Sequence, residues 1–199
     1  MKRPIAEVLT MTLKPGVESE RAQHEHAAWQ ILRRKQGYVT HRIYQHAAHP
    51  LQRLVYSEWE SKKAVDGARQ HLQGTPLMRQ ARAVLAAAPQ RLIMELIGPI
   101  TSTKGLDLPD GAIGAMVLGE ASDVAAWQTQ AEQLWKKLAN QAGHITHVLW
   151  RGLDDPRAVG SFSHWTSAAT LHEALVQAPA SPAEAGPNVA YEHYQPVHD

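Results

Sequence analysis

The chain of 199 residues contains no cysteine, which excludes disulfide bonds, thiolate metal sites and a cysteine nucleophile. It also lacks an excess of charge, because 20 Lys and Arg side chains stand against 19 Asp and Glu for a net charge of +1. Without a basic stripe, we expect neither nucleic acid nor an anionic membrane as a partner. No apolar run approaches the roughly 20 residues of a membrane span, and the N-terminus lacks the apolar block of a signal peptide. A cytoplasmic protein is the resulting expectation.

Several sequence motifs that are typical of enzyme active sites and cofactor-binding sites are missing too. The chain has no G-x-G-x-x-G, no G-x-x-x-x-G-K-[ST] and no G-x-S-x-G, so the common nucleotide-binding and hydrolase signatures are absent. Its 12 histidines show no spacing typical of a catalytic zinc site. His144 and His147 are three apart on a predicted strand and should point to opposite faces. His46 and His49 could converge in a loop, but Gly152 and Asp155 stand in their places in the second copy. We therefore predict neither a metal nor a cofactor.

What the sequence does contain is a repeat. Sliding the chain by 106 positions lays residues 29–76 over 135–182 without a gap and gives eleven identities in forty-eight positions. Unrelated sequences would give roughly three. The identities include two tryptophan pairs, Trp29 with Trp135 and Trp59 with Trp165, and the pair His41 with His147. The chain therefore reads as two copies of one unit.

Each copy shows the same order of patterns. In the first, an alternating stretch at 6–13 predicts a strand, and 17–34 predicts a helix with Ala22, Trp29 and Leu32 on its buried face. Further predicted elements are strands at 38–45, 53–59 and 91–97, a helix capped by Ser61 and a short helix at 77–85. In the second copy, strands are predicted at 112–118, 144–151, 159–165 and 189–194, with helices capped by Ser122 and Ser167. Only about seven residues precede its last strand, so the short helix is expected to be missing there.

This order predicts an α+β protein of two ferredoxin-like βαββαβ domains. The expected boundaries are 1–97 for the first domain, 98–110 for a linker rich in Pro, Gly and Thr, and 111–199 for the second. Helices cover one face of each sheet, and the other apolar face must also be removed from water. We therefore expect the two domains to pack sheet to sheet as an intramolecular dimeric α/β barrel. Such a pseudo-dimer could associate further as a homodimer.

Short motifs carry a resemblance to a known family. Lys14-Pro15-Gly16 after the first strand, Gln36-Gly37-Tyr38, the strand HRIYQ and the segment YSEWESKKAV resemble the antibiotic-biosynthesis-monooxygenase domain of the dimeric α/β-barrel superfamily. The second copy matches through Ala142-Gly143-His144 and FSHWTSAATL. The resemblance implies a pocket between sheet and helices for a small aromatic or quinone-type ligand. In some members this ligand is oxidised by O₂ without metal or flavin.

Other members of the superfamily degrade haem. Those proteins resemble this chain at the strand-end tryptophan but carry a second tryptophan and a haem-ligating histidine at positions that correspond here to about Ala68 and Ala81. An alanine cannot ligate iron, so haem degradation is disfavoured.

The first candidates for catalytic or substrate-binding residues are the two histidines at matching positions of the repeat. His41 and His147 each lie at the centre of an apolar strand face, where a lowered pKa would leave a neutral imidazole able to accept a phenolic proton. We predict His41 as the catalytic base and His147 as a substrate-binding residue. The alternative is that both are structural histidines, which their symmetric recurrence fits equally well.

A second set of predicted residues would bind the ligand. Trp59 is predicted as a catalytic pocket wall, and Trp165 as its counterpart, although both could simply pack under the following helix. Arg42 and Tyr44, on the opposite strand face from His41, could hydrogen-bond an oxygenated substrate. His71 is expected on the buried side of its helix, facing the same pocket.

Two functions follow as hypotheses. The first is a cofactor-independent monooxygenase, an oxidoreductase acting with O₂ on a small electron-rich aromatic or quinol-type substrate. The second is a non-catalytic, stress-associated module that binds a small hydrophobic molecule.

Overall fold

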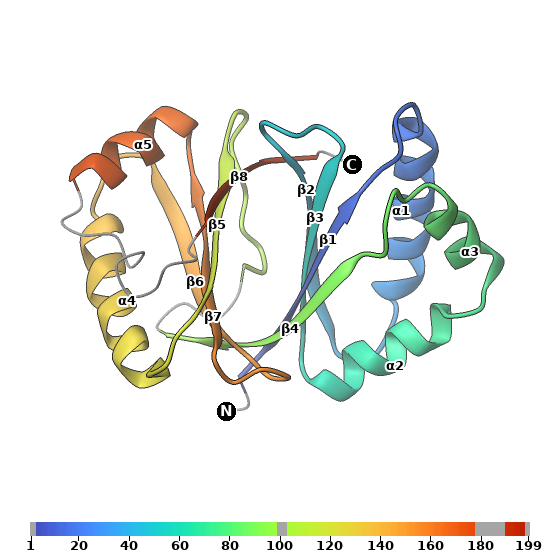
Figure 1. Cartoon of the computed structure of the whole chain (residues 1–199), viewed down its shortest axis with the longest axis horizontal. Coiled ribbons are helices and arrows are strands. Elements are labelled where there is room, and N and C mark those ends of the chain that lie inside the picture. The colour runs from blue at the N-terminus through green and yellow to red at the C-terminus, as the bar shows by residue number, and fades with distance from the viewer. Residues whose placement is uncertain (1–2, 99–102, 178–189, 198–199) are drawn as a thin grey trace.

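The strands of this protein close into one antiparallel barrel with helices on its outside (Figure 1). The computed structural model describes residues 3–98, 103–177 and 190–197. Helices α1, α2 and α3 lie on one side of the barrel, and α4 and α5 lie on the opposite side. No helix in these ranges is long and apolar enough to cross a membrane.

The order of elements repeats along the chain. The first half contains β1 (Ile5–Thr12), α1 (Glu18–Leu32), β2 (Tyr38–His46), β3 (Gln52–Trp59), α2 (Lys62–Leu72), α3 (Pro76–Ala83) and β4 (Gln90–Ile97). The second half contains β5 (Ile113–Glu120), α4 (Val124–Leu138), β6 (His144–Gly152), β7 (Ala158–Trp165), α5 (Ala168–Gln177) and β8 (Ala190–Pro196). The predicted elements are all present, with ends shifted by one or two residues. The predicted loss of a short helix from the second copy falls on residues 178–189, outside the described part of the chain.

Both halves contribute to one closed sheet. Its strand order is β1-β3-β2-β8-β5-β7-β6-β4, so β2 pairs with β8 and β4 pairs with β6 across the two seams between the halves. The sequence predicted two apolar sheets facing each other. In the structure, their edge strands are also joined, which removes the unpaired backbone groups that open edges would present.

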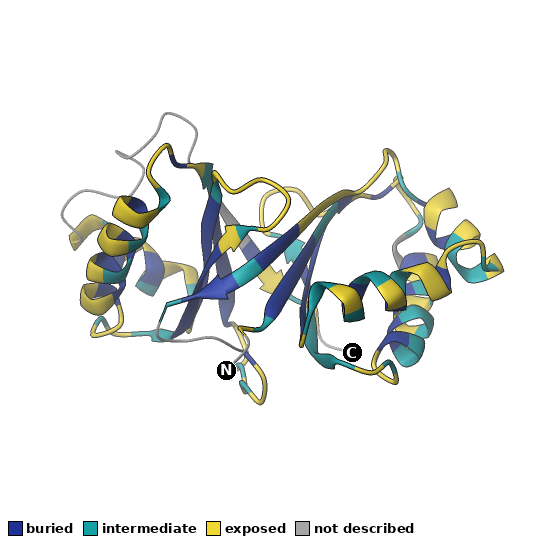
Figure 2. Ribbon diagram, turned by 90° about the horizontal axis from the view of Figure 1, so that it is seen from below, coloured by how far each residue is buried: buried dark blue, intermediate teal, exposed yellow. Residues whose placement is uncertain are grey.

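The barrel interior is filled by large side chains, and Figure 2 shows the strands as mostly buried and the outward faces of the helices as exposed. Tyr44, Tyr56, Trp150 and Phe162 are all fully buried in this interior. Gly160 makes room for them, because a Cβ at that position would lie 1.9 Å from Nε1 of Trp150. Burial of these aromatic rings is a large part of what stabilises the barrel.

Helix starts follow the predicted capping chemistry with one exception. The hydroxyl of Ser61 accepts a hydrogen bond from the backbone N–H of Ala64, and Ser167 does the same for Thr170. For α4 the predicted cap, Ser122, is wrong. Asp123 caps this helix instead, its carboxylate accepting from the N–H of Ala126 at 2.9 Å.

Candidate functional site

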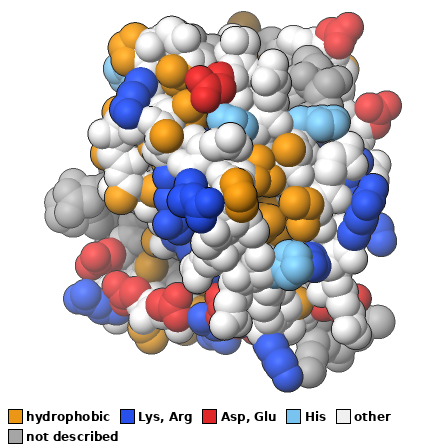
Figure 3. All heavy atoms as spheres, turned by 90° about the vertical axis from the view of Figure 1, so that its right-hand side faces the viewer, with side chains coloured by type: hydrophobic (Ala, Val, Ile, Leu, Met, Phe, Trp, Pro, Cys, Tyr) orange, Lys and Arg blue, Asp and Glu red, His pale blue; other side chains and the backbone are white. Residues whose placement is uncertain are grey.

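A cavity of about 180 Å³ lies between the outer face of the sheet and the helices of the first half. Its walls are apolar for most of their area and come from β1, β3, β4, α1, α2, α3 and the segment before β4. Figure 3 views the molecule from the side of α1, α2 and α3, and there hydrophobic side chains gather directly beside basic ones. The lining residues are Glu7, Leu9, Met11, Arg21, Glu25, Ala28, Trp29, Leu32, Val55, Arg69, Gln73, Met78, Ala81, Arg82, Leu85, Pro89 and Arg91.

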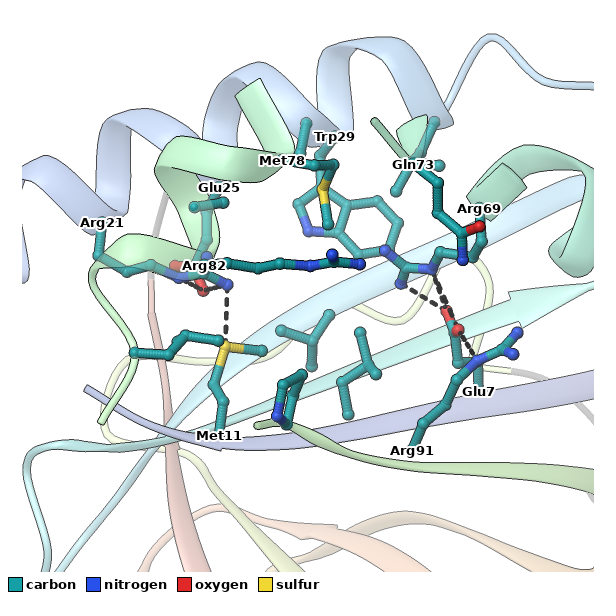
Figure 4. Close-up of a pocket in the computed structure, with 17 residues that line it drawn as sticks. Glu7, Met11, Arg21, Glu25, Trp29, Arg69, Gln73, Met78, Arg82 and Arg91 are labelled. Atoms are coloured by element: carbon teal, nitrogen blue, oxygen red, sulfur yellow. Dashed lines mark hydrogen bonds and ion pairs between the residues drawn. The ribbon is translucent and has the colours of Figure 1, made fainter. Parts of the chain in front are cut away.

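Glu7 anchors the charged end of this cavity (Figure 4). It lies on β1 with an exposed fraction of 0%. Arg69 of α2 donates to both carboxylate oxygens at 3.0 and 2.9 Å through Nε, and Arg91 of β4 donates to Oε1 at 2.7 Å. The hydroxyl of Ser57 adds a longer contact of 3.3 Å. A buried carboxylate needs such partners, and here they hold two arginines in fixed positions.

A second buried ion pair stands at the other end of the cavity. Arg21 and Glu25, one turn apart on α1, are 8% and 6% exposed and lie 2.9 Å apart. Arg21 also donates to Sδ of Met11 on β1. The pair occupies the face of α1 that packs on the sheet, whereas Ala22, predicted to lie on that face, is exposed.

Arg82 differs from the other arginines of the cavity. Its side chain forms no hydrogen bond or ion pair within the part of the chain that the structure describes. Figure 4 shows it extending along the cavity from the Arg21 end toward Arg69. Four arginines and two glutamates line the cavity, and Arg91 is also paired with Asp66 at 3.0 Å outside the lining, so one positive charge is left in excess.

The corresponding region of the second half is apolar. At the repeat offset of 106, Arg21 corresponds to Trp127, Glu25 to Ala131 and Arg69 to Leu175. By strand register, Glu7 opposite Ser57 corresponds to Ala115 opposite Ser163. These apolar residues belong to or pack against one hydrophobic cluster between α4, α5 and the sheet, which also includes Trp135 and Leu138. The charged cavity is thus a feature of the first half, and the described residues of the second half pack as an apolar core in the corresponding place.

His41 and His147 occupy matching positions on β2 and β6, but neither lines the cavity. The imidazole of His41 stacks on Trp29 with ring centroids 4.0 Å apart, and its Nδ1 lies 2.6 Å from the hydroxyl of Tyr38. His147 stacks on Trp135 at 4.6 Å. Trp29 does line the cavity, so His41 supports its wall from behind.

The surroundings of His147 correct one prediction. His144 and His147 were expected on opposite faces of their strand, yet their ring nitrogens lie 3.3 Å apart. A shift of register between His144 and Thr146 changes the alternation and brings both rings to one side. Burial, together with nearby His144, lowers the pKa of His147 to about 4.

Trp59 and Trp165 are both fully buried, and neither lines the cavity. Each indole N–H donates to a serine hydroxyl two residues earlier, Ser57 and Ser163, at 3.0 Å. In the first half, Ser57 in turn contacts Glu7. Trp59 therefore does not form a wall of the cavity. It is linked to Glu7 through the hydroxyl of Ser57.

The other predicted ligand-binding residues also lie elsewhere. Tyr44 points into the barrel, where its hydroxyl lies 2.7 Å from Nε2 of His164. Arg42 donates to the backbone carbonyl of Leu106, in the segment that connects the halves. His71 is exposed and does not line the cavity, so its predicted place on the buried side of α2 is wrong.

Sequence reasoning missed the charged residues of the cavity, namely Glu7, Arg21, Glu25, Arg69, Arg82 and Arg91. A usable signal was present in the repeat itself, because positions occupied by charges in one copy and by Trp, Ala or Leu in the other are poor candidates for shared packing. Ala81, one of the positions used to disfavour haem, does line the cavity. In the described ranges, no three His, Cys, Asp or Glu side chains converge as a metal site would require.

No protein-family model matches the chain, and no curated protein is detectably similar to it in sequence. Solved structures are similar over almost its full length. A candidate monooxygenase from Fusobacterium nucleatum aligns with a TM-score of 0.70 at 10% identity, covering 98% of this chain and 93% of that one. A candidate monooxygenase from Lactobacillus acidophilus gives 0.67 at 12% identity over 98% and 94%, and an anthrone oxidase-like protein gives 0.67 at 16% identity over 100% and 92%.

At these identities the likeness concerns fold. The predicted resemblance is confirmed at that level: the chain has the α/β barrel of the proteins named as monooxygenases, with both barrel halves in one polypeptide.

Proposed function

We propose that the first half of this protein is an oxygenase of a small electron-rich aromatic, and that the second half supports the barrel. The observation that carries the proposal is the cavity between sheet and helices, which is charged and open to a ligand in the first half and replaced by core packing in the second. The full-length likeness to proteins named as monooxygenases supports the reaction class. We further propose that units 1–97 and 111–199 arose by tandem duplication of one ferredoxin-like domain.

The chemistry requires no cofactor if the substrate supplies its own electrons. A hydroquinone and O₂ would give a hydroxyquinone and water, so one oxygen atom enters the product and the other is reduced to water. The step that needs help is formation of the electron-rich anion, because a neutral phenol transfers an electron to O₂ poorly. Positive charge around the ring lowers the pKa of a bound phenol, and the cavity supplies it through Arg69 and Arg82.

The role of His41 as the catalytic base stays a prediction that substitution can test. Because its ring lies behind Trp29, a direct proton transfer would need a different pose of one of the two side chains. His41→Ala should lower the oxidation rate and shift its pH profile if His41 is the base. A lower rate with an unchanged profile would instead assign His41 to support of Trp29.

The oxygenase proposal can be tested by substituting cavity residues of the first half with their counterparts from the second half. Arg21→Trp combined with Glu25→Ala copies Trp127 and Ala131, and should fill the cavity while preserving the fold, since replacing a buried ion pair by well-packed apolar groups is often neutral. Oxygen consumption is measured with a panel of dihydroxyaromatics, against blanks for autoxidation. We expect protein-dependent consumption in the wild type and in Gln23→Trp, which adds an indole on the exposed face of α1, and none in the double variant. Equal rates in all three proteins would refute the proposal.

A second candidate function, ligand binding without turnover, is favoured by one observation. Both lining carboxylates, Glu7 and Glu25, are paired with arginines, and no histidine lines the cavity. Such a site offers no unoccupied general base. Binding of an aromatic ligand that is lost in the double variant, with no oxygen consumption by any protein, would select this function.

A further inference from the structure

The charges of the cavity are unbalanced in a way that points to its ligand. Glu7 already accepts from Arg69, Arg91 and Ser57. Glu25 is paired with Arg21. Neither carboxylate is left to neutralise Arg82, whose side chain extends along the cavity toward Arg69 (Figure 4).

Two guanidinium groups directed into one largely apolar space repel each other. A negatively charged group between them would turn that repulsion into two attractions and could accept hydrogen bonds from the planar donors that arginine provides. A cationic ligand would meet an excess of positive charge, and a neutral one would gain no charge attraction from Arg82. The cavity is therefore complementary to an anion.

The size and walls of the cavity define the rest of the ligand. About 180 Å³ is slightly more than the roughly 150 Å³ of a cavity that binds benzene, so one substituted ring fits. Leu9, Leu32 and Val55 offer apolar contact, and the indole of Trp29 offers a face for stacking. Gln73 at the exposed edge adds a polar group suited to a hydroxyl.

We infer that the cavity selects a single-ring aromatic anion, of the size of a hydroxybenzoate, and that Arg82 is the residue that determines this specificity. The inference rests on the proposed function for the location of the site and defines the class of substrate it takes. Arg69 is held by Glu7 and forms the fixed side of the anion site. Arg82, an exposed residue of α3, forms the side that the ligand orders.

The test compares two isosteres of different charge. Binding of 2,5-dihydroxybenzoate and of 2,5-dihydroxybenzamide is measured by calorimetry at pH 7.5 without oxygen, for the wild type, Arg82→Gln, Arg82→Lys and Arg79→Gln. Arg79 is the matched control, because it lies on the same helix and donates to the carbonyl of Gly74 away from the cavity. Both Arg79 and Arg82 are exposed, so the substitutions should leave the fold intact.

We expect the wild type and Arg79→Gln to bind the acid about 10- to 100-fold more tightly than the amide, the range given by one charge-assisted hydrogen-bonded pair. Arg82→Gln should remove most of this preference, Arg82→Lys should keep part of it, and added salt should reduce it. Equal binding of acid and amide by the wild type, absence of binding by both, or an unchanged preference in Arg82→Gln would overturn the inference. Oxygen consumption is scored separately. Turnover of neutral hydroquinones without a preference for acids would support the oxygenase and contradict the anion site. Binding of the acid without turnover would support the anion site and contradict the oxygenase.

Discussion

Acid should destabilise this protein through a histidine in the barrel interior. His164 is fully buried, its Nε2 lies 2.7 Å from the hydroxyl of Tyr44, and its other ring nitrogen has no partner among the described residues. Burial, with smaller contributions from Arg42 and His144, lowers its pKa from 6.5 to about 3. A protonated imidazole would place a buried charge among aromatic side chains, at a cost in folding free energy.

The sign and size of the effect follow from proton linkage. Because the pKa is lower in the folded than in the unfolded chain, the unfolded state binds the proton more readily between pH 6.5 and about 3. His164 therefore costs no stability above pH 6.5, and its cost grows as the pH falls toward 3. For these two pKa values the loss at pH 5 is about 2 kcal/mol of unfolding free energy. His147, with a pKa of about 4, acts in the same direction.

Urea unfolding at pH 7.5, 6 and 5 measures this effect. The variant His164→Gln keeps a hydrogen-bonding group for Tyr44 but cannot titrate, so between pH 7.5 and 5 it should lose about 2 kcal/mol less than the wild type. His172→Gln is the control, because His172 is exposed on α5 and should leave the pH dependence unchanged. The same pH dependence in wild type and His164→Gln would refute the assignment of a strongly lowered pKa to this residue.

Two further predictions concern packing and the hydrogen-bonded chain that ends at Glu7. Gly160→Ala should destabilise the fold by about 2 kcal/mol or more in thermal or urea unfolding, because the new methyl meets Trp150 inside the barrel, whereas Gly67→Ala meets nothing within 4 Å on α2 and should stabilise by about 0.5–1 kcal/mol. Destabilisation of the same size by both would show that backbone effects dominate. Ser57→Ala should cost about 1–3 kcal/mol and weaken ligand binding, because it leaves a buried indole N–H unpaired and removes a contact to the carboxylate. Ser163→Ala breaks the equivalent indole contact in the second half and should cost similar stability without affecting binding.

Local patterns in the sequence determine where the strands and helices lie better than which side chains they bury. The strands can be predicted because alternation is a local property, but alternation does not say which face turns into the barrel, where Tyr44, Tyr56 and Trp150 lie. Helix α1 is placed correctly, and Trp29 and Leu32 are buried as predicted. Only Ala22 is exposed, and near the start of the helix the buried positions are taken by the ion pair of Arg21 and Glu25. In a sequence, a buried ion pair cannot be distinguished from two charged residues on a solvent-exposed helix face.

The residues of the candidate site were even harder to predict from the sequence than the buried face of α1. The repeat led to His41, His147, Trp59 and Trp165, because identical residues at matching positions draw attention. Identity between halves reflects the packing that both must share, and the stacking of each histidine on a tryptophan is such packing. Among the residues that the structure describes, the charges of the cavity belong to the first half, so they lie at positions where the copies differ.

The sequence by itself determined the duplication, the order of strands and helices, and the need to cover an apolar face of each sheet, because these depend on periodicity and composition along the chain. Only the tertiary structure decided how the barrel closes, with β2 joined to β8 and β4 to β6, and which charges meet around Glu7. Arg69 and Arg91 lie 62 and 84 residues from Glu7 in the chain. Strand register and helix docking bring them together, and no local pattern of residues encodes a distance of that kind.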